Sequence, residues 1–223
     1  MSFKCQYCQS EFKSEKTIMV HICEPKRRWT NKDEKYSRLA FHAFNRFYEI
    51  TQAVGKKDFE DFAKSKFYLG FTKFGKHIIN INAINPEDFI DFVIQNSVKL
   101  DKWCSDSVYE TYVQELNRKE SADRAVERSI LLMQKWSDEY ERPFNEFFKE
   151  VSKPLAIHYI KSGRISPWVI FNCDNGAELI DSFSDHELNI INEYLEPAFW
   201  TRKFNARVED VQFVKMILKK AGV

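Results

Sequence analysis

Apolar residues recur at intervals of three and four along most of this 223-residue chain, and this spacing predicts helices. The first long stretch runs from about residue 33 to Val54, and Gly55 is expected to end it. A second predicted helix runs from about Lys57 to Phe67, with a continuation to Phe74 as the alternative. Both stretches are rich in Phe at core spacing, which favours burial over exposure for these rings.

Several later helices are predicted from residues that favour a helix start. Asn85 precedes Pro86 and two acidic residues, a combination typical of a first helical turn. Ser121 and Ser184 are expected to cap two further helices. The last helix is predicted from Val208 to Ala221, where the apolar residues again follow one face.

Three stretches are less regular. Residues 77–82 predict either a short β-like segment or a buried connector, and residues 165–171 either a strand or a buried turn that leads into a helix. Asn175-Gly176 is a turn signal. Residues 30–223 together predict one all-α, multi-helix globular domain of eight to ten helices.

Composition supports a helical protein, because six Gly and six Pro are few for this length. No run of eighteen apolar residues is present, and the first residues do not form the apolar core of a signal peptide. We therefore expect no contact with membranes and a cytoplasmic location. Cys104 and Cys173 are expected to be buried free thiols.

The first 23 residues follow a pattern that metal chemistry explains better than packing. Two residues separate Cys5 from Cys8, and twelve separate Cys8 from His21. Three apolar residues complete the pattern: Phe3, Phe12 and Ile18. From Phe3 to His21 the segment resembles the two-Cys, two-His zinc finger. The resemblance implies a small ββα fold around a zinc ion.

The fourth ligand departs from that family, which leaves three to five residues after the first His. Here the next candidate is Cys23, with only Ile22 between. Two residues on a helix differ by about 200° in direction, so the helix should end near His21, with Cys23 in an extended exit. Pro25 is expected to disfavour helix at Glu24. Cys5, Cys8, His21 and Cys23 thus predict a tetrahedral zinc site, and four unligated residues in a surface hairpin are the alternative.

A metal would explain how so short a segment folds. About thirty residues with so few apolar side chains cannot bury enough surface alone. Zinc supplies on the order of 10–16 kcal/mol of binding free energy to such a fold. Since four protein ligands leave no open position, we expect a structural and not a catalytic ion. The predicted organisation is a finger with its basic connector at residues 1–29, followed by the helical domain at residues 30–223.

Charge is unevenly distributed. Residues 1–32 hold seven Lys/Arg and three Asp/Glu, a net of +4. The whole chain has 34 and 33, so the remainder has 27 and 30, a net of −3. This asymmetry favours contact with the phosphate backbone of DNA or RNA. The candidate nucleic-acid-binding residues are Lys4, Lys13, Lys16, Lys26, Arg27, Arg28 and Trp29.

Reading of base sequence is not expected from this finger. Alignment on Phe12 places Ser14, Thr17 and Val20 at the helix positions that face bases in the family. None of the three side chains can make the bidentate hydrogen bonds that identify a base. One finger also covers only about three base pairs. Binding by this finger should therefore depend on the backbone and on salt.

No specific catalytic motif is found in the sequence, and we expect no enzyme. Asp185-His186-Glu187 stands at a predicted helix start, where capping explains it and a metal or acid–base role is the alternative. Residues 199–204 mix aromatic and cationic side chains and form a candidate second contact surface.

The single finger, its His-x-Cys ending and the Phe-, Lys- and Asn-rich helical body resemble uncharacterised small proteins of T-even-like bacteriophages. A viral origin would place the chain in the host cytoplasm. The leading hypothesis is a nucleic-acid-binding accessory protein that also contacts a replication, repair or transcription protein. The alternatives are an interaction or assembly adaptor whose finger binds protein, and a nuclease or other enzyme with an unrecognised site.

Overall fold

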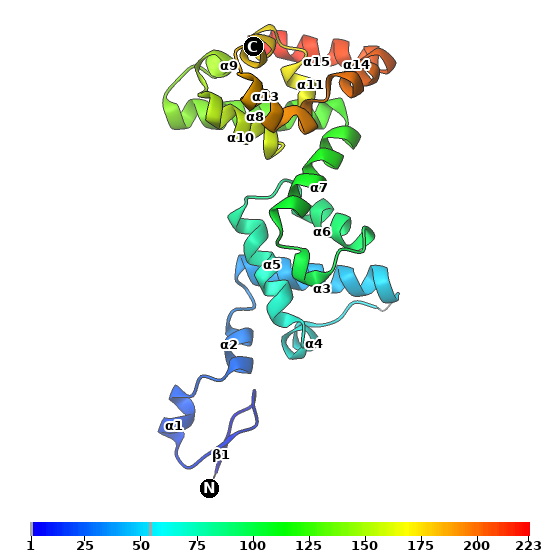
Figure 1. The fold of residues 1–223 in the computed structure, drawn as a ribbon. Coiled ribbons are helices and arrows are strands. Elements are labelled where there is room, and N and C mark those ends of the chain that lie inside the picture. Colours follow the sequence, from blue (N-terminus) through cyan, green and yellow to red (C-terminus); the bar gives the residue numbers. More distant parts are fainter. Residues whose placement is uncertain (1, 54) are drawn as a thin grey trace. The chain divides into compact units, whose positions relative to one another are not determined.

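A computed structural model describes residues 2–53 and 55–223, which form two compact units (Figure 1). The first unit is Met1–Val108 and the second is Tyr109–Val223. The described residues are mostly helical, and the two strands among them belong to one short hairpin. The predicted fold class, an all-α body with a small N-terminal ββα motif, is confirmed. The predicted division into a finger at residues 1–29 and one domain at residues 30–223 stays a prediction.

The ββα motif begins with strands β1 (Phe3–Lys4) and β2 (Glu11–Phe12), which pair antiparallel with Phe3 opposite Phe12. Helix α1 (Glu15–Val20) follows, and Ser14 caps it by accepting a hydrogen bond from the backbone N–H of Thr17. The helix ends where the ligand spacing predicted, because His21 already has extended backbone (φ −68°, ψ 122°).

The basic connector is a helix, α2 (Glu24–Thr30), and the expectation that Pro25 disfavours helix at Glu24 is wrong. Pro25 lies in the first turn, where no backbone N–H is needed for an intrahelical bond. Cys23 is the N-cap, and its carbonyl accepts the N–H of Arg27 at 2.9 Å.

The rest of the first unit is a cluster of four helices around aromatic rings. Its elements are α3 (Lys35–Gln52), α4 (Phe59–Lys64), α5 (Tyr68–Asn80), α6 (Pro86–Gln95) and the 3-10 helix η1 (Leu100–Lys102). Phe62 lies 5.1 Å from Phe44 between ring centroids, and Phe74 lies 4.9 Å from Trp103. All four rings are buried, as the spacing of the three Phe residues predicted. The predicted end of the first long helix, Val54, lies outside the described residues.

Two predictions for this unit need correction. The helix predicted from Lys57 to Phe67 ends earlier, at Lys64, and its continuation to Phe74 is not part of the same helix, because the chain leaves helical geometry between α4 and α5. Most of residues 77–82, predicted as β-like or as a connector, continues α5 as far as Asn80. Gly75 within α5 allows this helix to approach α3 closely, since a Cβ there would lie 2.2 Å from the carbonyl oxygen of Tyr36.

The second unit contains the remaining helices, of which α7 (Asp106–Lys119) begins just before the division between the units. The others are α8 (Ala122–Tyr140), η2 (Phe144–Glu146), α9 (Phe147–Glu150), α10 (Lys153–Lys161), α11 (Pro167–Ile170), α12 (Asp174–Asp181), α13 (Asp185–Leu195), α14 (Pro197–Ala206) and α15 (Val208–Ala221). Ser184 caps α13 and α15 has the predicted bounds. Ser121 occupies the N-cap position of α8, as predicted, but its side chain makes no capping hydrogen bond.

Short helices make the count larger than predicted, since the described residues after position 30 contain thirteen α-helices instead of eight to ten. Residues 167–170 form α11, which corresponds to the buried turn into a helix and not to a strand. Asn175-Gly176 lies inside α12, so the turn prediction there is wrong. Gly176 serves packing, because a Cβ would lie 2.6 Å from the carbonyl oxygen of Ile170.

A buried ion pair lies within this second unit. Arg128 on α8 donates to both carboxylate oxygens of Glu120, at 2.5 and 2.7 Å. The Glu120 side chain is 3% exposed, and the Ser166 hydroxyl donates to it at 2.9 Å. This pair joins the chain after α7 to α8 and to the start of α11.

Candidate metal centre and nucleic-acid interface

Four side chains of the ββα motif lie together as the sequence predicts. The three thiols of Cys5, Cys8 and Cys23 and one ring nitrogen of His21 lie within 4.8 Å of one another. Cys5 Sγ and Cys23 Sγ are 3.9 Å apart, and Cys8 Sγ is 3.3 Å from His21 Nε2. This cluster can hold a metal ion.

The spacing of these atoms fits tetrahedral coordination. Metal–sulfur distances near 2.3 Å and metal–nitrogen distances near 2.0–2.1 Å imply about 3.8 Å between two sulfurs and about 3.6 Å between sulfur and nitrogen. The separations of 3.9 and 3.3 Å differ from these values by a few tenths of an ångström. The donor set of three thiols and one imidazole therefore fits a four-coordinate metal closed by protein ligands.

Local backbone structure places each ligand. Cys5 follows β1, and its N–H and carbonyl are bonded to Ser10 and Gln9 in the turn that carries Cys8. Gln9 has a left-handed φ of 62°, which reverses the chain tightly enough to bring Cys8 beside Cys5. His21 closes α1, and Cys23 reaches back from extended backbone (φ −98°, ψ 164°).

The thiols differ in acidity. Hydrogen bonds from Ser10 and then from His21 lower the pKa of Cys8 to about 6. Burial raises the pKa of Cys23 above its ordinary value. Cys8 is thus the thiol of the two that most readily becomes the thiolate that a metal binds. The ring of His21 is held against Phe12, with a centroid distance of 4.5 Å.

The predicted nucleic-acid-binding residues divide into two groups. Lys4, Lys13, Lys16 and Arg27 are exposed on the surface. Lys4, Lys13 and Lys16 form no ion pair with any described residue, and Arg27 lies 3.7 Å from the exposed carboxylate of Glu24. These four cations can reach a ligand.

The other three residues have contacts within the first unit. Lys26 Nζ donates to the carbonyl of His21 at 3.0 Å. Arg28 donates to the carbonyl of Ala63 at 2.7 Å and lies 4.5 Å from the Tyr68 ring centroid. The rings of Trp29 and Phe59 are 5.8 Å apart and nearly perpendicular. Arg28 and Trp29 thus fasten α2 to α4 and α5.

A groove of about 700 Å³ lies between the Cys5–Cys8 turn and the two helices α2 and α4. Its charges are balanced, because Arg28 pairs with Glu24 at 3.1 Å and Lys64 pairs with Glu60 at 2.5 Å. This groove therefore has no excess positive charge for a phosphate backbone.

The positions expected to face bases have little capacity to read them. The Ser14 hydroxyl accepts the N–H of Thr17 and lies 2.8 Å from the Thr17 hydroxyl, so these two side chains satisfy each other. Val20 is 76% exposed and offers only methyl groups.

Sequence reasoning missed an apolar surface on this motif. Met19 and Ile22 are 73% and 66% exposed and flank Val20 along the chain. The sequence contains a signal for this exposure. Met19 and Ile22 alternate with Ile18, His21 and Cys23, and those three residues are the ones that face the small core or the metal cluster.

Asp185-His186-Glu187 has a structural explanation. The Glu187 carboxylate accepts the N–H of Ser184 at 2.8 Å, and Ser184 Oγ accepts the N–H of Glu187. The Ser184 backbone and then its side chain lower the pKa of Glu187. These are the contacts of a capping box, as the capping interpretation predicted.

Comparisons with models of known protein families, with curated proteins and with solved structures give no match for this chain. The resemblance to bacteriophage proteins stays a prediction. Within the described residues, no helix combines the length and the apolar character that crossing a bilayer requires.

Proposed function

We propose that the N-terminal motif is a zinc finger in which Cys5, Cys8, His21 and Cys23 hold a structural zinc ion. Three thiolates and an imidazole suit zinc, and four protein ligands leave no position for a substrate or a reactive water. Zinc binding would supply on the order of 10–16 kcal/mol toward folding a motif that buries little else.

Cys23→Ala tests the unusual fourth ligand. We expect the variant to lose zinc to a chelator at concentrations that leave the wild-type protein loaded, because a closed tetrahedral site becomes an open one. Cys104→Ala is the control, since Cys104 lies outside the cluster. Equal zinc retention in both variants would show that the fourth ligand is a different group.

We further propose that the chain is a non-enzymatic nucleic-acid-binding accessory protein and that its finger binds the phosphate backbone. The observation that carries this proposal is the set of four exposed cations on the ββα motif and on α2, which are Lys4, Lys13, Lys16 and Arg27. Ser14, Thr17 and Val20 add no base-reading groups, so discrimination between sequences should be weak. A replication, repair or transcription protein would be the partner of the helical body.

The charges set the expected salt dependence. Four phosphate contacts give a slope of log affinity against log salt of about −2.8 for single strands and about −3.6 for duplex DNA. Affinity should therefore fall about 50-fold and about 150-fold, respectively, between 50 and 200 mM salt.

The decisive experiment compares two variants that each lose four positive charges. One replaces Lys4, Lys13, Lys16 and Arg27 by alanine. The control replaces the exposed Lys64, Lys66, Lys99 and Lys102 of the same unit. Binding of short labelled DNA and RNA strands to the zinc-loaded chain is measured across a salt series. For single strands, the slope of log affinity against log salt should be shallower by about 2.8 in the finger variant, while the control variant keeps the wild-type slope. Equal slopes would refute the finger as the binding surface.

A second candidate function is favoured by the exposed apolar residues Met19, Val20 and Ile22. A finger that presents these side chains suits a protein partner, as in an assembly adaptor. Val20→Glu should abolish binding to such a partner and leave the salt slope for nucleic acid unchanged. If this substitution and the four-cation variant weaken nucleic-acid binding equally, the adaptor function loses its support.

A further inference from the structure

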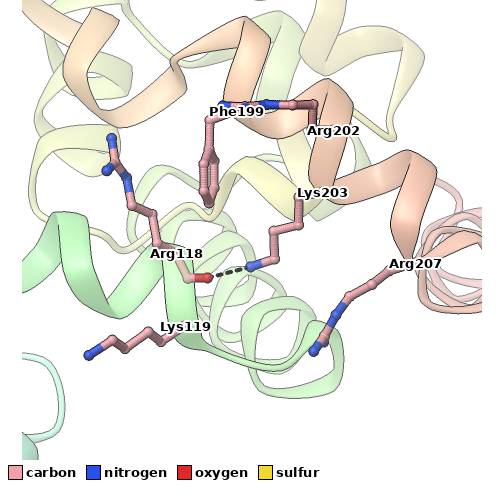
Figure 2. Close-up of a pocket in the computed structure, with 6 residues that line it drawn as sticks. All are labelled: Arg118, Lys119, Phe199, Arg202, Lys203 and Arg207. Atoms are coloured by element: carbon pink, nitrogen blue, oxygen red, sulfur yellow. Dashed lines mark hydrogen bonds between the residues drawn. The ribbon is translucent and has the colours of Figure 1, made fainter.

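A second cationic site lies in the other unit, between the end of α7 and α14. The pocket measures about 510 Å³. Figure 2 shows the six residues that line it, five of them cationic: Arg118, Lys119, Phe199, Arg202, Lys203 and Arg207. Its lining includes no carboxylate. The second unit as a whole has 16 Lys/Arg and 19 Asp/Glu in residues 109–223, so this concentration of positive charge runs against its net charge of −3.

Neighbouring acids neutralise only part of this charge. Arg118 pairs with Glu196 at 3.0 Å, Lys119 with Glu115 at 2.6 Å and Arg207 with Asp210 at 3.3 Å. All three pairs are exposed, and such pairs are weak enough to be exchanged for a stronger anion. Arg202 and Lys203 form no ion pair with any described residue, which leaves a net charge of about +2 by this count.

Lys203 lies deepest among these cations. Its Nζ donates to the carbonyl of Arg118 at 2.8 Å, which Figure 2 shows as a dashed line, and lies 4.8 Å from the Trp200 ring centroid. Burial and then the charge of Arg207 lower the pKa of Lys203 to about 8. The charges of Glu120 and Asp210 act in the opposite direction without outweighing these two effects. An anion in the pocket would add to the stabilisation of the charged ammonium.

Two buried polar side chains adjoin Lys203. The Asn117 carboxamide and the Trp168 indole N–H have no hydrogen-bond partner within the described part of the chain. Lys203 Nζ lies 3.5 Å from the backbone carbonyl oxygen of Asn117 and 5.1 Å from the Trp168 ring centroid. Because the Asn117 carboxamide leaves an oxygen acceptor as well as its N–H donors without a partner, these buried groups alone do not select the charge of a ligand. The five cationic side chains that line the pocket favour an anionic ligand over a cationic one.

Phe199 adds a feature that a simple anion would not need. Its ring is half-exposed and points into the pocket between Arg118 and Lys203 (Figure 2). The guanidinium of Arg118 lies 5.0 Å from its centroid. An aromatic ring beside several cations is the arrangement by which proteins stack an unpaired base while they hold its phosphates.

We propose that this pocket binds single-stranded nucleic acid, with phosphates held by Arg202, Arg207 and their cationic neighbours and a base stacked on Phe199. The site goes beyond the zinc finger and does not require a metal. Duplex DNA does not suit it, since paired bases present no free face to Phe199. Inorganic phosphate and free nucleotides share part of this chemistry and serve as competitors in the test.

The experiment measures binding of a short labelled single strand to the zinc-loaded full chain across a salt series. Arg202→Ala with Arg207→Ala should lower affinity roughly tenfold and make the salt slope shallower by about 1.4, as expected for two phosphate contacts. Phe199→Leu should lower affinity about tenfold with the slope unchanged, because stacking releases no counterions. Lys215→Ala with Lys219→Ala, two exposed cations of α15, is the matched control and should change neither quantity.

Three outcomes would overturn the proposal. The first is a control variant that weakens binding as much as the Arg202 and Arg207 variant. The second is an unchanged affinity in Phe199→Leu. The third is competition by inorganic phosphate or ATP as effective as competition by the unlabelled strand, which would assign the pocket to a small phosphate compound. Near-UV circular dichroism checks that each variant is folded.

The two nucleic-acid proposals fail separately. The variant of Lys4, Lys13, Lys16 and Arg27 tests the finger, and it leaves the pocket intact. If Arg202→Ala with Arg207→Ala still lowers the affinity for the single strand roughly tenfold in that background, the pocket is supported even if the finger binds nothing.

Discussion

Replacing Arg128 by alanine tests how much one buried ion pair stabilises the second unit. Arg128 makes three hydrogen bonds: two to the Glu120 carboxylate, at 2.5 and 2.7 Å, and one from Nε to the carbonyl of Gly163, at 2.8 Å. After the substitution Glu120, whose side chain is 3% exposed, keeps the Ser166 hydroxyl as its remaining hydrogen-bond donor. A buried carboxylate would then lack a counter-charge.

The expected cost is large for one substitution. Removal of one partner from a buried ion pair typically lowers the free energy of unfolding by about 3–5 kcal/mol, because the other charge stays buried without compensation. Most of this cost comes from the Glu120 carboxylate, which stays buried without a counter-charge. Glu120→Gln in the same chain should therefore restore part of the stability that Arg128→Ala removes, since a neutral amide is less costly to bury than a carboxylate.

Hydrogen exchange of the α8 amides is the suitable assay, because the chain has two units and a single unfolding transition cannot be assumed. Arg128→Ala should speed exchange from the globally protected amides of α8 by about two to four orders of magnitude at neutral pH, which corresponds to about 3–5 kcal/mol. Lys135→Ala, an exposed residue on the same helix, is the control. If both variants exchange at similar rates, or if Glu120→Gln slows nothing in the Arg128→Ala background, the reasoning is refuted.

Two further predictions concern packing and pH. Gly75→Ala should lower the free energy of unfolding of the first unit by about 1–3 kcal/mol or more, since its Cβ would meet the Tyr36 carbonyl oxygen at 2.2 Å. Gly55→Ala is the control and should not destabilise this unit, because a Cβ there meets nothing within 4 Å. Equal urea midpoints for the two variants would contradict this prediction. The folded-state pKa of Lys203, about 8, is below the ordinary value of 10.5, so between these values the unfolded chain binds more protons and the free energy of unfolding should rise with pH. Lys203→Met should reduce that rise between pH 8 and 10 in urea titrations, and an identical rise in both proteins would show that Lys203 does not carry the effect.

The sequence predicts some elements well, for physical reasons that are local. Ligand spacing determines the metal cluster, since Cys5, Cys8, His21 and Cys23 must all reach one point. Helix starts are also local, because a cap such as Ser184 satisfies N–H groups only three residues away. The same holds for the end of α1 at His21, where the ligand requirement decides the backbone geometry.

Local signals are wrong where a distant contact decides. Asn175-Gly176 predicts a turn, yet Gly176 lies inside α12, where the Ile170 backbone approaches too closely for a side chain. Gly75 lies inside α5 for the same packing reason. Pro25 is misread in a related way: its effect depends on whether it falls inside a helix or in the first turn, and the Cys23 cap puts it in the first turn. The structural role of such glycine and proline residues can be assigned only once the tertiary contacts around them are known.

The difference between what local sequence shows and what tertiary contacts decide matters most to function for the distribution of charge. Counting Lys and Arg identifies the first 32 residues as basic, but it cannot tell Arg28, which donates to the Ala63 carbonyl, from Arg27, which is exposed. For the pocket on the second unit, the sequence indicates only one side: residues 199–204 are a candidate contact surface, and they contain Phe199, Arg202 and Lys203. Arg118 lies 84 positions before Arg202, so no window of sequence shows that the two residues share a pocket. Helix packing brings the end of α7 beside α14, and there Lys203 donates to the last carbonyls of α7. Lys203 therefore contacts the end of α7 and also lies in the pocket that we propose binds an anionic ligand, so the same residue would serve a structural contact and a binding surface.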